Sequence, residues 1–251
     1  MRRAFLLLAV LALAGCGGGS GTPTGETTSA TPTHESTLPT TLALRAYFLG
    51  PGGNVQPVAR SVSATPAVGR AVIGQLLAGP GADEGLTTAI PAGTELRDLA
   101  ISNGVADVRL SQTLPRAARA QLVYTLTQFP TVSSVTIDGG PRVSRADFED
   151  ETPQILVETP LRGSTVSSPI RIAGTANTFE ATFDAQVLDA NGNELARRFV
   201  TATSGNGQRG TYDVELRVDG PPGKITLVVF EPSAENGEPL HRVEIPLRLA
   251  G

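Results

Sequence analysis

Two acidic stretches contain the residue types that bind divalent cations. Residues 147–151 read Asp-Phe-Glu-Asp-Glu, and residues 189–194 read Asp-Ala-Asn-Gly-Asn-Glu. Calcium needs several oxygen ligands that one framework makes converge. The first stretch lies at an expected domain boundary, where charge runs are usually solvated. The second has its glycine too early for an EF-hand, with Val200 where the loop needs glutamate. We therefore expect no metal, a solvated joint at the first stretch and a hairpin turn at the second.

The two histidines form no recognisable catalytic constellation. His34 lies among Gly, Ser, Thr and Pro residues, and His241 begins an expected strand without a Gly-x-Ser-x-Gly elbow in the sequence. We find no P-loop motif and no His/Cys metal spacing. Paired carboxylates for glycoside hydrolysis stay open, because they meet only in the fold. Aromatic residues are only 4% and Trp is absent, so sugar-stacking platforms are scarce. We expect a protein that is not an enzyme and needs no cofactor.

The single cysteine, Cys16, follows an export signal. Arg2 and Arg3 precede an unbroken apolar run over residues 4–13, which is too short for the roughly 20 residues of a spanning helix. The tetrapeptide Leu-Ala-Gly-Cys ending at Cys16 resembles the bacterial lipobox, which implies cleavage between Gly15 and Cys16 and acylation of the thiol, as with palmitate. The alternative is an ordinary signal peptide that a cysteine happens to follow. We expect residues 1–15 to be a lipoprotein signal peptide and the bilayer to hold the acylated N-terminus on the outer face of the bacterial cytoplasmic membrane.

Residues 16–41 consist mainly of Gly, Ser, Thr and Pro, with almost no large apolar side chain. Such a segment buries too little surface to offset its ordering entropy, so we expect a disordered tether. The formal net charge of the chain is -4, which gives no basic footprint for nucleic acid. We expect no nucleic-acid partner.

Residues 42–145 alternate strand and helix signals and predict an α+β domain. Apolar residues alternate over 42–49, and 55–58 follows a Gly-Pro-Gly-Gly turn as its partner strand. Thr65 and Pro66 open an expected helix that Gly79-Pro80 ends. Two further strands flank Asn103-Gly104, a type I′ hairpin dipeptide. A second helix over about 115–128 and a strand over 132–137 complete two helices on one small antiparallel or mixed sheet.

From residue 76 to 91 an expected helix ends in Gly-Pro, an acidic residue follows, and Ile-Pro leads into a hairpin. With this segment as its most specific part, the first domain resembles the GerM-type (GerMN) domain of bacterial sporulation and germination proteins. These positions can all be structural: Gly79 as a left-handed C-cap, Pro80 as a stop and Glu84 as an acceptor of loop N–H groups. A binding role for Glu84 is the alternative. The motif positions carried over from the family are Gly79, Pro80, Glu84 and Pro91.

Residues 154–251, after an acidic linker over 146–153, predict an all-β sandwich. Seven short runs with alternating apolar residues are separated by Gly, Pro, Asn or Ser, as an immunoglobulin-type sandwich requires. Gly174 and Phe179-Glu180 are among the residues that resemble the immunoglobulin-like domain of bacterial spore germination.

The export signal and the lack of a catalytic motif predict a non-enzymatic extracytoplasmic protein, and the GerM resemblance implies a role in envelope or spore-associated assemblies. We expect an interaction or scaffold module that binds an envelope protein in sporulation-like or germination-like assemblies, through a sheet face or edge strand. The alternative is a module that binds peptidoglycan or another envelope polymer.

Overall fold

The computed structural model describes residues 40–251. The predicted signal peptide, Gly15, Cys16 and nearly all of the predicted tether therefore lie outside the described residues. Residues 40–251 belong to one compact unit. Among them, no helix has the length and apolar character needed to cross a membrane.

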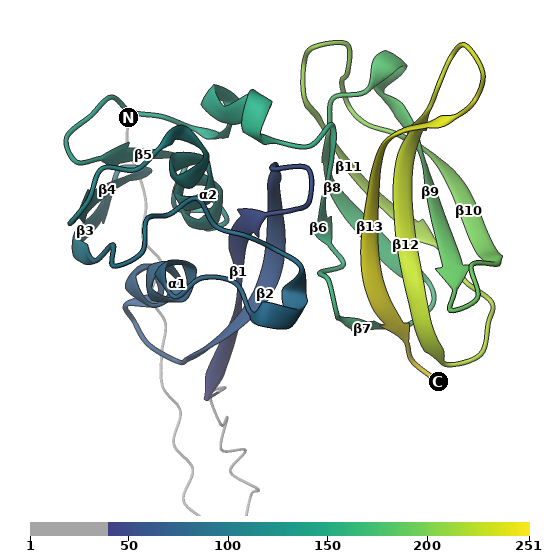
Figure 1. Cartoon of the computed structure of the whole chain (residues 1–251), viewed down its shortest axis with the longest axis horizontal. Helices are drawn as coiled ribbons and strands as arrows, with labels where there is room; N and C mark the ends of the chain where they lie inside the picture. The colour runs from purple at the N-terminus through teal and green to yellow at the C-terminus, as the bar shows by residue number, and fades with distance from the viewer. Residues whose placement is uncertain (1–39) are drawn as a thin grey trace, which may run out of the picture. The chain divides into compact units, whose positions relative to one another are not determined.

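The first half of the described chain combines strands and helices (Figure 1). Its elements are β1 (Thr41–Leu49), β2 (Val55–Ser63), α1 (Val68–Leu77), the 3-10 helix η1 (Ala82–Glu84), β3 (Leu96–Ser102), β4 (Val105–Leu110), α2 (Arg116–Leu126), β5 (Ser134–Ile137) and the 3-10 helix η2 (Arg145–Glu151).

The strands of this half form two sheets, and the prediction of one sheet was wrong. β1 and β2 pair antiparallel as a separate ribbon. β4 is the centre of a mixed sheet, antiparallel to β3 and parallel to β5. The Asn103-Gly104 turn between β3 and β4 has positive φ at both residues, as a type I′ turn needs.

The ribbon stays separate because α2 occupies the free edge of β1. Gln121 donates to the carbonyl oxygen of Tyr47 at 3.0 Å, and the amide of Tyr47 donates to Oγ1 of Thr125 at 3.1 Å. Gln128 exchanges two hydrogen bonds with the backbone of Arg45. These side chains satisfy backbone groups that would otherwise pair with a third strand.

The first helix begins later than the sequence predicts, and the second begins where expected but ends earlier. Thr65 accepts a hydrogen bond from the amide of Ala67 at 3.1 Å, yet α1 starts at Val68. α2 covers 116–126 rather than about 115–128, with Pro115 as its N-cap. Val72, Ile73 and Leu76 are the buried face of α1, as helical spacing predicts.

The second half is made of strands packed as a two-sheet sandwich. One sheet has the order β10-β9-β12-β13-β7 and the other β11-β8-β6. β7 pairs parallel to β13 and was missed in the sequence, because a two-residue strand gives no periodic signal. The elements are β6 (Ile155–Thr159), β7 (Thr165–Val166), β8 (Ile170–Ala176), the 3-10 helix η3 (Phe179–Ala181), β9 (Thr182–Asp189), β10 (Glu194–Thr201), β11 (Gly210–Leu216), β12 (Gly223–Pro232) and β13 (Pro239–Leu249).

The two halves have separate apolar cores. The first surrounds buried Tyr47, Phe48 and Phe148. The second lies between the sandwich sheets around Phe183 and Tyr212, whose ring centroids are 4.8 Å apart. The outer face of β6 adds Leu156 to the first core, which makes this strand common to both halves.

Candidate functional site

Glu84, the acidic position of the first motif, is held by an arginine. Both of its carboxylate oxygens accept hydrogen bonds from Arg60 of β2, at 2.7 and 2.9 Å. The amide of Gly81 donates to Oε2 at 2.8 Å, so Glu84 also accepts a loop N–H. The hydrogen bonds from Arg60 outweigh partial burial and lower the pKa of Glu84. Arg60 in turn stacks on the Phe48 ring, 5.0 Å from its centroid. In this arrangement Glu84 fastens η1 to the ribbon.

The other motif positions of the first half also shape the chain. Gly79 has φ +85°, and its amide donates to the carbonyl oxygen of Leu76 at 3.1 Å, which ends α1 in left-handed geometry. Pro80 follows directly. Pro91 accepts two hydrogen bonds from Thr94, one from the amide and one from the hydroxyl.

Gly174 lies where two strands and a tyrosine converge. A Cβ on this residue would come within 2.0 Å of the Leu156 carbonyl oxygen and 2.9 Å of the Tyr212 hydroxyl. That hydroxyl donates to the same carbonyl at 2.9 Å. Glycine is therefore required for β6, β8 and Tyr212 to approach so closely.

Phe179 and Glu180 form an exposed turn before β9. The Phe179 side chain is 60% exposed, and its amide donates to Glu231 at 2.9 Å. Glu180 has φ +53°, with its amide bonded to Asn206. Of these two positions, only Phe179 offers an exposed apolar side chain.

The acidic joint exposes Asp147 and Asp150 to solvent, as the sequence predicted, and its carboxylates also have ordered partners. Asp147 accepts hydrogen bonds from the amide and the hydroxyl of Ser144, and Asp150 forms an ion pair with Arg116. Glu149 accepts two hydrogen bonds from Arg209 of the sandwich, at 2.8 and 2.9 Å. The joint is thus fixed to both halves.

A second set of contacts crosses the boundary between the two halves, here called the seam. The sequence did not predict these contacts. Arg145 of η2 donates to Glu158 of β6 at 2.9 Å, and the Tyr47 hydroxyl donates to the same carboxylate oxygen. The guanidinium carbon of Arg145 lies 4.6 Å from the Tyr124 ring centroid and 5.5 Å from that of Tyr47. No spacing in the sequence links these residues, because they converge only when β6 packs on the first core.

Electrostatics at this seam favour an ionised glutamate and a neutral tyrosine. Burial raises the pKa of Glu158, but the Arg145 charge and the hydrogen bonds from Tyr47 and Arg145 outweigh it, so that the pKa is lowered overall. Burial, together with the Glu158 charge, raises the pKa of the Tyr47 phenol well above its usual range. Tyr47 therefore stays a donor across the physiological pH range.

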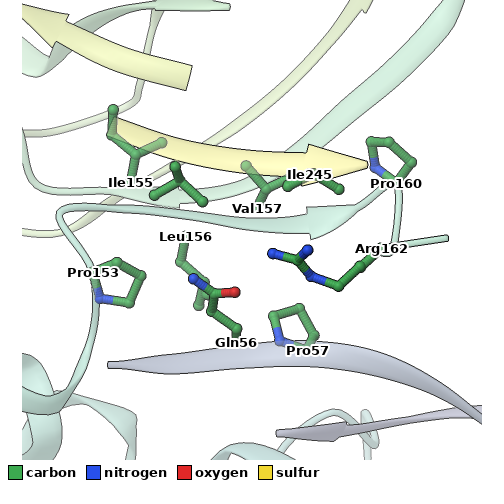
Figure 2. A pocket seen from close by; sticks show the side chains of 10 residues that line it. Gln56, Pro57, Pro153, Ile155, Leu156, Val157, Pro160, Arg162 and Ile245 are labelled. Carbon is green, nitrogen blue, oxygen red and sulfur yellow. The ribbon is translucent and has the colours of Figure 1, made fainter. Parts of the chain in front are cut away.

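Two grooves border the seam. The first, here called the seam groove, has a volume of about 800 Å³ and lies between the loop around Gly52, the joint around Gln154, Arg162 and the start of β13. A smaller pocket adjoins it, where the Arg162 side chain reaches between Pro57 of β2 and strand β6 (Figure 2). Arg162 was not singled out from the sequence, since nothing around it marks a site.

The second groove, here called the threonine groove, has a volume of about 610 Å³. It lies over the outer face of β8 and β11. Its lining includes Thr175, Thr203, Thr211 and the ion pair of Arg171 with Asp213.

Residues 40–251 contain no group of three His, Cys, Asp or Glu side chains arranged to hold a metal ion. The acidic stretch from Asp189 forms the turn between β9 and β10, as the sequence predicted. Asp189 accepts hydrogen bonds from the amides of Asn191 and Asn193 there, both at 2.8 Å. His241 is 3.8 Å from Glu231, with its side chain 47% exposed.

An α+β half followed by an immunoglobulin-like sandwich defines the class of this protein. Residues 45–142 match the family described as sporulation and spore germination, and residues 154–238 match the immunoglobulin-like domain of bacterial spore germination. The chain therefore carries a GerM-type domain followed by that immunoglobulin-like domain, as the resemblances predicted.

Solved structures also resemble the chain. A candidate lipoprotein from Clostridium perfringens is 18% identical, with 43% of this chain and 88% of that chain covered and a TM-score of 0.30. The first GerMN domain of the sporulation protein GerM from Bacillus subtilis is 18% identical, with coverages of 41% and 95% and a TM-score of 0.32. The tandem GerMN domains of the same protein are 15% identical, with coverages of 72% and 62% and a TM-score of 0.36. No curated protein matches this chain in sequence.

Proposed function

We propose that this protein is a lipid-anchored extracytoplasmic interaction module that holds an envelope protein in assemblies of the sporulation or germination type. The observation that carries the proposal is the fixed seam. Arg145 joins Glu158, and Glu149 joins Arg209, so each half contributes charged groups to the other. A scaffold needs its binding surfaces at a constant mutual geometry, which reduces the ordering cost of binding.

The family matches support the setting of this role. Both are to domains of bacterial sporulation and spore germination proteins. The anchor rests on Cys16 and the export signal before it. A multiply acylated N-terminus would retain the folded part at the membrane surface.

Membrane fractionation with crosslinking tests this proposal. We expect the wild-type chain in the membrane fraction, with a mass that includes lipid, and crosslinked to one defined envelope protein. Cys16→Ala should be released or left unprocessed, whereas the control Ser20→Ala should behave as wild type. If Cys16→Ala stays membrane-bound and fully processed, the anchor is wrong. If the anchored wild type crosslinks to no defined protein, the scaffold role is wrong.

The threonine groove favours a second candidate, binding of peptidoglycan or another envelope polymer. Its hydroxyl and charged groups could hydrogen-bond to sugar hydroxyls. Sedimentation with purified cell wall tests this role. The wild type should co-sediment, and a Thr175→Val, Thr211→Val double variant should co-sediment less. Equal sedimentation of both proteins would exclude the threonine groove as the polymer site.

A further inference from the structure

The seam groove contains an arginine that forms no salt bridge within residues 40–251, although the charges of Glu244 and Glu84 lie near enough to act on it. Arg162 is partly buried, and burial lowers its pKa. Within residues 40–251 its recorded hydrogen bond is from Nη2 to the backbone carbonyl oxygen of Glu244, at 3.0 Å. A guanidinium has five N–H donors, so most of its donor capacity is unused by the protein.

The carboxylates near Arg162 are already engaged. Glu84 is paired at both oxygens with Arg60, and the Glu244 carboxylate is 2.6 Å from Arg242. Neither forms an ion pair with Arg162 among the described residues. A partly buried guanidinium without a hydrogen-bonded carboxylate loses hydration that more distant charges do not replace, and a partner's carboxylate would restore it.

Gln154, which lines the same groove, has a side-chain oxygen without a hydrogen-bond donor among the described residues. Oε1 of Gln154 is buried and has no hydrogen-bond partner within residues 40–251. Gln154 and Arg162 both line the seam groove. A buried acceptor without a hydrogen bond destabilises the protein, because it has lost its water and gained no donor in return.

We propose that the seam groove binds an acidic peptide segment of a partner protein, with an Asp or Glu carboxylate on Arg162 and a backbone N–H donated to Gln154. A peptide brings both groups, an anion and a donor. A phosphate group would satisfy Arg162 but brings no N–H for Gln154. This inference rests on the proposed role as an interaction module and adds the chemistry of its partner.

Peptide selection on the full-length chain in detergent tests the proposal. The probe is a displayed library of random twelve-residue peptides. We expect selected sequences to be enriched in Asp and Glu over the starting library. A selected peptide, made synthetically, should bind Arg162→Gln and Gln154→Met each at least about tenfold more weakly than wild type, as expected for a lost charge-assisted hydrogen bond or a lost buried one.

Two controls separate binding from folding. Arg248→Gln removes an exposed arginine from β13 and should leave peptide affinity unchanged. Arg162→Gln should unfold at the same temperature as wild type or higher, because it removes a partly buried cation that forms no salt bridge within residues 40–251. A clearly lower unfolding temperature would show that Arg162 serves the fold, and would overturn the proposal.

Other outcomes also contradict it. Selection without acidic enrichment, or equal affinity of wild type and Arg162→Gln, would exclude an acidic peptide. Displacement of the selected peptide by millimolar inorganic phosphate, with a neutral peptide bound equally well, would assign the groove to phosphate. If acidic-peptide binding fails but membrane crosslinking still captures a defined protein, the proposed function stands without this inference. If the crosslinking fails, the proposed function and the inference both fail.

Discussion

Arg145 and Glu158 face each other across the seam, with Nη1 of the arginine 2.9 Å from Oε1 of the glutamate. Arg145 belongs to η2, and Glu158 belongs to the first strand of the sandwich. Their side chains are 26% and 19% exposed, so water screens the pair less than it screens a surface pair. This pair makes the two halves depend on each other.

Replacing Arg145 should destabilise the protein as a whole. Arg145→Gln leaves the Glu158 carboxylate without its cation and removes the stacking on Tyr124, which should cost about 3 kcal/mol of unfolding free energy. The exposed pair of Arg171 and Asp213 supplies the control, since Arg171→Gln should cost less than about 1 kcal/mol. Denaturant unfolding measures both. Equal losses would mean that the seam pair contributes no more than a surface pair.

The seam should weaken in acid. The pKa of Glu158 and that of Glu149 are both lowered, although burial opposes this in each case, because Arg145 and Arg209 favour the charged form. Their stabilisation is complete above the ordinary glutamate pKa of about 4.3 and is lost as pH falls through the lower folded-state values.

Unfolding free energies measured at constant salt should therefore fall below about pH 5. Glu158→Gln should show a shallower decline than wild type, since one of the linked protons is removed. Parallel declines would place the acid sensitivity elsewhere.

Glu84 should matter for stability through Arg60. Glu84→Ala leaves a largely buried guanidinium over Phe48 without its carboxylate and frees the Gly81 amide, so we expect a loss of about 2–3 kcal/mol. Asp83→Ala, at the exposed neighbouring position in η1, should change little. If thermal unfolding is the same for both variants, the Glu84 fastening is not needed for the fold.

Two glycines should respond to alanine in opposite directions. Gly174→Ala forces a Cβ onto the Leu156 carbonyl and should cost more than about 2 kcal/mol. Gly74→Ala, in α1, meets no atom within 4 Å and should stabilise by about 0.5–1 kcal/mol. Unfolding free energies of the two variants decide this, and a tolerated Gly174→Ala would show that β6 and β8 can separate without penalty.

Local signals in the sequence account for many of the observed elements. Asn103-Gly104 predicted the hairpin of β3 and β4, and helical spacing predicted the buried face of α1. Alternation predicted strands of the sandwich such as β11. These signals are local, because they depend on turn geometry and on one face being buried.

What the sequence missed depends on contacts distant along the chain. Gln121 and Thr125 lie on α2 as fully buried polar residues, and their hydrogen bonds to β1 keep the ribbon apart from the other sheet. The pairing of Glu149 with Arg209, 60 residues away along the chain, gives no local signal in the sequence. No local sequence pattern distinguishes Arg162, because the lack of a salt bridge can be recognised only from the folded structure around it.

Site-specific photo-crosslinking in intact cells tests the central claim, that the seam groove receives a protein partner. Gly52 is exposed at the groove, and an added Cβ there makes only ordinary contact, so it is the probe position. Exposed Asn236, in the turn between β12 and β13, is the control. We predict one defined protein adduct from Gly52 that Arg162→Gln abolishes, and none from Asn236. No adduct from Gly52, or the same adduct from both positions, would contradict the account.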